Sequence, residues 1–162
     1  MTVFFWIAAV IGGLAVAALL TGQAGVFNGE QPGDLGVHDG RLKGLSPTDN
    51  CVSSQASLYP AHPRRSDADI APISLQGDGP ATLARIATVI VGLPGARIVE
   101  QRGNYLYAQF TTRLMKFVDD VEFWYDPGVQ AIQVRSASRV GSKDLGANRK
   151  RVEAIRSAMT AN

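Results

Sequence analysis

The sequence predicts an α+β chain: an N-terminal membrane helix, followed by a two-layer domain in which two helices cover an antiparallel sheet of about five strands. Residues 3–20 form an 18-residue run without a charge, which reaches the length a helix needs to cross a membrane. Further along, runs of alternating apolar residues are separated by short turns, as in antiparallel strands. Two stretches with apolar residues at three- and four-residue spacing predict the amphipathic helices that cover one sheet face.

The first 22 residues are predicted to be a transmembrane anchor, with a cleaved signal sequence as the alternative. A signal peptide has basic residues before its apolar run, and here there are none, although Gly22 and Ala24 offer a weak cleavage site. After the run, the first basic residue is Arg41, so nothing basic near the helix holds its C-terminal side in the cytoplasm. We therefore expect the domain to be exported, with the membrane bound through residues 3–20.

Residues 23–48 are predicted to be a Gly-, Pro- and Asp-rich linker that precedes a domain over 49–162. This stretch has no apolar period. It is expected either to extend from the membrane or to form a loop lying over the domain.

The domain is predicted to begin with a short strand and a helix. Residues 69–75 are typical of a strand, and Pro72 confines them to a sheet edge or a strand beginning. Pro80 suits the first turn of a helix that Gly92 and Pro94 end. The apolar stripe of this helix comprises Leu83, Ile86, Ala87, Ile90 and Val91.

Two strands over 96–101 and 105–110 then form a hairpin around Gly103, and a second helix closes the chain. Asp144 is expected to cap that last helix, because a carboxylate there can accept a hydrogen bond from a free amide. Its predicted apolar stripe is Leu145, Val152, Ile155 and Met159.

A second hairpin joins strands over 118–125 and 131–140 through the turn sequence Asp126-Pro127-Gly128. A tight turn centred on Pro127 and Gly128 sets the register, because apolar residues of both strands must share one face. The expected cross-strand pairs are Phe123 with Ile132, Val121 with Val134 and, on the other face, Asp120 with Arg135.

Composition excludes several classes of function. The 162 residues carry a net charge of only +2, which provides no general attraction for nucleic acid. The single cysteine, Cys51, excludes an intramolecular disulfide and a four-cysteine zinc site. The two histidines lie in Gly- and Pro-rich stretches, so we expect no metal and no cofactor.

Three segments, 134–153, 118–123 and 50–54, together resemble an uncharacterised bacterial and plastid family, domain of unknown function 1499. The resemblance covers about residues 40–158. It implies an exported or membrane-linked domain, and it brings no activity or cofactor. Together with the expected export, we predict an anchor in a bacterial inner membrane and a domain in the periplasm. Ser46 stands where many members have a second cysteine, which argues against a two-thiol role.

Polar residues of these segments form the candidate site. Arg149 lies in the first turn of the last helix, where the helix dipole disfavours a cation, so a carboxylate or bound anion is expected beside it. One interpretation is an Asp–Arg network that joins the hairpin to the helix. The other is a site for an anionic ligand at Arg135, Arg139, Arg149 and the free helix amides. The candidate residues are Asp119, Asp120, Arg135, Ser136, Ser138, Arg139, Asp144, Asn148 and Arg149.

Three functional hypotheses remain open. The first is a non-catalytic accessory or interaction subunit of a membrane assembly, with other membrane proteins as partners. The second is a binding domain for an anionic small molecule or lipid headgroup. The third is a hydrolase or transferase that uses the Cys51 thiol, for which the sequence offers no rigidly held base.

Overall fold

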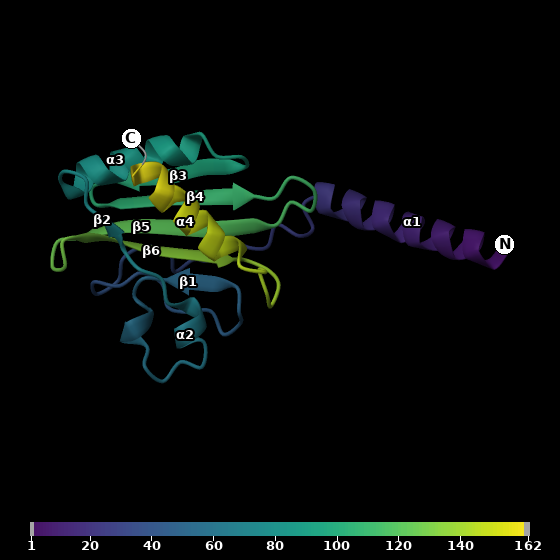
Figure 1. Cartoon of the computed structure of the whole chain (residues 1–162), viewed down its shortest axis with the longest axis horizontal. Helices are drawn as coiled ribbons and strands as arrows, with labels where there is room; N and C mark the ends of the chain where they lie inside the picture. The colour runs from purple at the N-terminus through teal and green to yellow at the C-terminus, as the bar shows by residue number, and fades with distance from the viewer. Residues whose placement is uncertain (1, 161–162) are drawn as a thin grey trace.

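The computed structural model describes residues 2–160 and confirms the predicted α+β architecture (Figure 1). Helix α1, Thr2–Gln23, projects from one end of the domain, and helices α3 and α4 lie on one face of an antiparallel sheet. The apolar window of α1 has a mean hydropathy of 2.5 and none of it is buried. Length and composition suit a membrane anchor or a signal sequence.

The sheet has six strands, and the first of them was not predicted. β1 spans only three residues, Cys51–Ser53, which are too few to show the alternation of apolar and polar residues that is typical of a strand. Its neighbour β6 also pairs with the two-residue strand β2, and the main path runs in the order β1-β6-β5-β4-β3. The other bounds are Ile73–Ser74 for β2, Ala96–Arg102 for β3, Tyr105–Thr111 for β4, Val118–Asp126 for β5 and Ala131–Ser138 for β6.

The predicted register of the β5–β6 hairpin is wrong by two residues. Asp126 pairs with Ala131, so four residues form the loop, and Gln130 closes it in a left-handed conformation at φ 51°. A shift of two residues leaves every side chain on its expected face, so the apolar pattern could not distinguish the two registers. The observed pairs are Phe123 with Val134, Asp120 with Ala137 and Glu122 with Arg135.

Helix α3 spans Gly79–Val91 and α4 spans Ala147–Thr160, and most of their apolar residues bury against the sheet. Val91, the last residue of α3, was expected in the buried stripe but is 72% exposed. The Asp78 side chain caps α3 by accepting from the amide of Ala81 at 2.7 Å. The core that joins both helices to the sheet includes Leu83, Ile86, Ile90, Leu106, Val121, Phe123, Val134, Val152, Ile155 and Met159. Smaller pieces between β1 and β2 are the turn η1, Ala56–Leu58, and helix α2, Arg65–Ala68.

Leu145 does not belong to the α4 stripe, contrary to the prediction. It precedes the helix at φ 53° and is 87% exposed. Helix α4 begins at Ala147. The Asp144 side chain accepts a hydrogen bond from the amide of Asn148 in its first turn.

Residues 29–44, called the strap here, cross the sheet face opposite α3 and α4. Leu42 of the strap is buried against Tyr105 and Tyr107 of β4, with Leu35 and Val37 packed beside them. The strap is thus the loop lying over the domain, the second of the two arrangements considered for this stretch. Both faces of the sheet are covered, one by helices and one by irregular chain.

Candidate functional site

The nine candidate residues do not form one cluster, because neighbours along β5 and β6 point to opposite faces of the sheet. Asp120, Arg135 and Arg139 lie beneath the strap. Asp119 and Ser136 lie on the helix side, where they contact α4 residues. We call these groups the strap-face cluster and the helix-face cluster.

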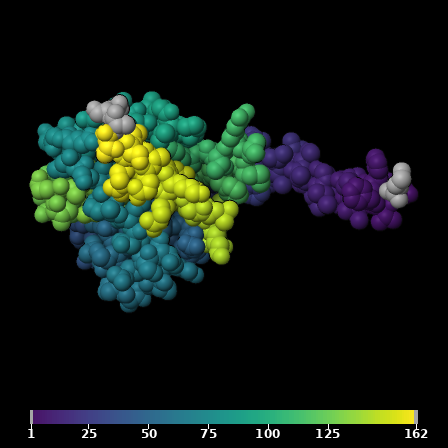
Figure 2. Space-filling model, in the orientation of Figure 1, coloured from purple at the N-terminus to yellow at the C-terminus, as the bar shows by residue number. Residues whose placement is uncertain are grey.

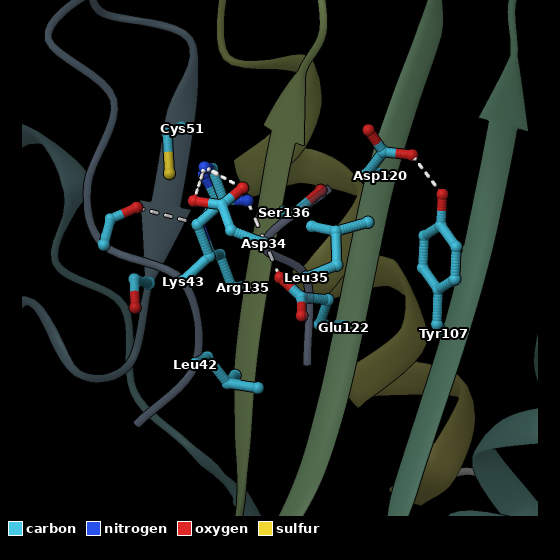
Figure 3. Close-up of polar contacts among 12 residues, drawn as sticks. Asp34, Leu35, Leu42, Lys43, Cys51, Tyr107, Asp120, Glu122, Arg135 and Ser136 are labelled. Carbon is cyan, nitrogen blue, oxygen red and sulfur yellow. Dashed lines mark hydrogen bonds and ion pairs between the residues drawn. The ribbon is translucent and has the colours of Figure 1, made fainter. Parts of the chain in front are cut away.

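A bidentate ion pair is the centre of the strap-face cluster. Arg139 donates from Nε and Nη2 to the two carboxylate oxygens of Asp120, at 2.9 and 2.7 Å. Tyr107 donates its hydroxyl to the same carboxylate at 2.5 Å, as Figure 3 shows. The hydrogen bonds from Arg139 to Asp120 raise the pKa of the guanidinium, and burial above all raises the pKa of Tyr107 to about 12. Both groups therefore keep their protons at neutral pH.

Glu122 and Arg135, which face each other across β5 and β6, form a second and looser pair. Glu122 is fully buried, and its Oε1 accepts from the Gly36 amide at 2.7 Å and the Tyr105 hydroxyl at 2.8 Å. Arg135 Nη1 lies 3.7 Å from Glu122 Oε2, while Arg135 Nε donates to the carbonyl of Gly44. Within residues 2–160, Oε2 has no hydrogen-bond partner. Burial raises the pKa of Glu122, and the Gly36 amide and Arg135 oppose this rise.

The helix-face cluster is built around Asn148, which is fully buried at the start of α4. Its Oδ1 accepts from Ser136 Oγ at 2.5 Å, and its Nδ2 donates to Ser138 Oγ and to the carbonyl of Asn50 at 3.0 Å each. The same Nδ2 donates to Asp144 Oδ2 at 2.8 Å. One amide therefore joins β6, the residue before β1 and the start of α4.

Arg151 is a member of the helix-face cluster that the sequence reasoning missed. It forms an ion pair with Asp119 and donates from Nη1 to Asn148 Oδ1 at 2.7 Å. Its guanidinium carbon lies 4.7 Å from the centre of the Phe110 ring, within cation–π range. Its spacing of three residues from Asn148, on the same helix face, was the signal that could have found it.

Glu122 was also missed, and the wrong register explains why. Asp120 and Glu122 alternate on β5 opposite Gln109 and Tyr107 on β4, so a paired polar face was visible in the sequence. The tight-turn register placed Asp120, and not Glu122, across from Arg135.

Asp144 and Arg149 have structural partners at the start of α4. Asp144 accepts from the amides of Gly146 and Asn148 at 2.8 Å each. Burial alone would raise the pKa of Asp144, but these amides outweigh it and the pKa falls below its usual value. Arg149 donates to the carbonyls of Asp67 and Asp69 at 2.9 and 2.7 Å, where a carboxylate or bound anion was expected.

Cys51 lies on β1 opposite Ala137 and is buried, with 7% of its surface exposed. Figure 3 shows it beside the ion pair of Lys43 and Asp34 in the strap. The ring of His38 lies near the carbonyl of Leu35, and His62 accepts from the amide of Arg64, so neither imidazole is bonded to the thiol. Across residues 2–160, no three His, Cys, Asp or Glu side chains are grouped as a metal site would require.

The carboxylates and guanidinium groups of both clusters are matched in number. Asp120 pairs with Arg139, Glu122 with Arg135 and Asp119 with Arg151. An anion bound at Arg135 or Arg139 would have to displace the strap and compete with a carboxylate already in place. These contacts join the sheet to the strap on one face and to α4 on the other.

Comparison with known proteins found one family and no individual relative. The chain matched no curated protein and no solved structure. A family model described as protein of unknown function (DUF1499) matches residues 41–159, which extend from the end of the strap almost to the end of α4. The chain belongs to this family, as the three motifs indicated.

Proposed function

We propose that this chain is a membrane-anchored, exported accessory domain that acts by binding a neighbouring membrane protein and not by catalysis. The observation that carries the proposal is the strap. It donates from the Gly36 amide to Glu122, and its Gly29 and Gly44 carbonyls accept from Arg139 and Arg135. A domain fastened in this way keeps one orientation at the end of α1, and therefore presents the same surface to partners in the bilayer.

The end of α1 also packs directly on the domain, which supports a retained anchor over a cleaved signal sequence. Gln23 donates from its side-chain amide to the carbonyls of Arg113 and Leu114 at 3.2 and 2.8 Å. A Cβ placed on Gly22 would lie only 2.9 Å from the Met115 backbone, so this contact requires glycine. Cleavage near Gly22 or Ala24 would remove or disturb these contacts.

The polar clusters support a non-catalytic role. Their charges neutralise one another beneath the strap and α4, and the Cys51 thiol is buried with neither imidazole bonded to it. A nucleophile needs such a base or a lowered pKa. A periplasmic location at a bacterial inner membrane is part of the proposal, and the absence of Lys and Arg from residues 1–40 of the sequence supports it.

Site-specific photo-crosslinking in native membranes tests the proposal. A photoreactive residue would replace Leu14 on α1 or Val91 at the end of α3, both exposed, and Val129 in the distal β5–β6 loop would serve as the matched control. We expect a discrete heavier adduct from Leu14 or Val91 and none from Val129, with a matching complex on a blue-native gel. Only the monomer at all positions, or adducts from Val129 alone, would overturn the proposal.

A further inference from the structure

A groove of about 610 Å³ opens at the end of the domain from which α1 emerges. One wall is the turn after α3, at Pro94 and Gly95, and the other is the β4–β5 loop with Arg113 and Lys116. Phe110 and Arg151 also line it. None of the candidate residues chosen from the sequence lies in this groove.

The groove carries an excess of positive charge. Arg113, Lys116 and Arg151 line it and no acidic residue does. Arg151 is neutralised by Asp119, but Arg113 and Lys116 take part in no ion pair within the described part of the chain. Two cations are thus free to meet an anion, in contrast to the guanidinium groups beneath the strap.

The position of the groove relates this charge to the membrane. The Arg113 and Leu114 carbonyls accept from Gln23 at the end of α1, and the Phe117 and Phe27 rings lie 5.5 Å apart. Figure 2 shows the green β4–β5 loop at the base of the helix. Leu114, between the two cations, is 62% exposed. Basic side chains around an exposed apolar residue suit the interface of an anionic bilayer.

We infer that this groove binds the phosphate of an anionic phospholipid in the leaflet where α1 leaves the membrane. Arg113 and Lys116 donate to the phosphate oxygens, and Leu114 contacts the upper part of the acyl chains. The inference requires α1 to be retained, but it does not require the partner protein proposed above. Each basic side chain near an anionic surface contributes about fivefold to binding.

Native mass spectrometry of the full chain, released from micelles that contain equimolar phosphatidylglycerol and phosphatidylcholine, tests this inference. We expect the chain to retain phosphatidylglycerol preferentially. Arg113→Gln with Lys116→Gln should reduce that preference about 25-fold, and each single substitution about fivefold. Arg113→Lys, which keeps the charge, should retain most of it.

The matched control is Arg65→Gln with Arg85→Gln, which removes two exposed charges from α2 and α3. An equal loss in this control, or an unchanged preference in the Arg113 and Lys116 variant, would overturn the inference. A competition arm separates lipid from free anion: soluble glycerol phosphate at millimolar concentration should not displace the lipid. Full displacement would identify a site for a soluble phosphate and would also overturn the inference. A failed crosslinking experiment would leave this result unaffected.

Discussion

The two faces of the sheet carry their polar groups in different ways, and the difference follows from what covers them. Under α3 and α4 the face is mostly apolar, with one amide-centred cluster at Asn148. Under the strap it carries two carboxylates, two guanidinium groups and two tyrosines. A helix satisfies its own backbone groups, whereas an irregular segment leaves amides and carbonyls without partners.

The strap shows this requirement at several points. The Gly36 amide needs Glu122, the Leu42 amide needs the side chain of Gln55, and the Gly44 carbonyl needs Arg135. Buried backbone groups without such partners would cost about 1–3 kcal/mol each. The irregular chain of the strap therefore accounts for the charged side chains on this face just as well as a bound ligand would.

The largest expected effect comes from breaking the ion pair under the strap. Arg139→Met leaves the Asp120 carboxylate buried without its partner, and we expect a loss of about 3–5 kcal/mol in the free energy of unfolding. Urea titration of the detergent-solubilised full chain, followed by circular dichroism, measures this.

Two variants sharpen that result. Arg139→Met with Asp120→Leu should cost less than Arg139→Met alone, because no charge is left unpaired. Arg64→Met, which breaks the exposed pair with Asp67, should cost at most about 1 kcal/mol. A double variant less stable than Arg139→Met would show that the pair is not the centre of this face.

The helix face should respond less to the loss of its central amide. Asn148→Ala removes a neutral group whose partners include Ser136, Ser138 and Asp144, and we expect a loss of about 2–3 kcal/mol, measured by the same titration. The exposed control Asn104→Ala should change stability by less than about 0.5 kcal/mol. A cost for Asn148→Ala above that of Arg139→Met would reverse the ranking of the two faces.

At the entry to α4, Asp144→Ala should cost about 1–2 kcal/mol at neutral pH, because the amides of Gly146 and Asn148 lose their acceptor. The folded chain lowers the pKa of Asp144, so its contribution is present above the unfolded value of about 3.9 and is lost as the pH falls through the folded value. The free energies of unfolding of the unsubstituted chain and of Asp144→Ala, measured between pH 3 and pH 7, check this. Parallel stability curves across that range would contradict a charged cap.

The smallest effect is expected at Leu145, and it has the opposite sign. Leu145→Gly should stabilise the domain by about 0.5–1 kcal/mol, because glycine adopts the left-handed conformation at φ 53° without steric cost. Thermal unfolding measures the change. Leu145→Ala, which keeps the strained backbone, should be close to neutral, and equal stabilisation by both variants would attribute the gain to lost apolar exposure.

Most elements of the fold could be predicted because their signals are local. Each signal lies within one short, continuous segment of the sequence: the apolar run of α1, the stripe of α3 and the alternation along β4, β5 and β6. β1 was not predicted because three residues are too few to show an alternating pattern. The β5–β6 register was predicted wrongly because the loop after Asp126 is longer than its turn residues suggested. Of the site, the predicted hairpin placed Asp120 and Arg135 on the same face of the sheet, yet Glu122 and Arg151 were not identified.

The sequence by itself determined the N-terminal apolar helix, the class of fold, the family and the face on which residues of the predicted strands lie. Tertiary structure alone decided which carboxylate meets which guanidinium, and that an aperiodic stretch lies over the sheet as the strap. The physical reason is that periodicity assigns a side chain to a face without setting its partner. A two-residue shift preserves every face, and only contacts between distant segments, such as Gly36 with Glu122, distinguish one arrangement from another.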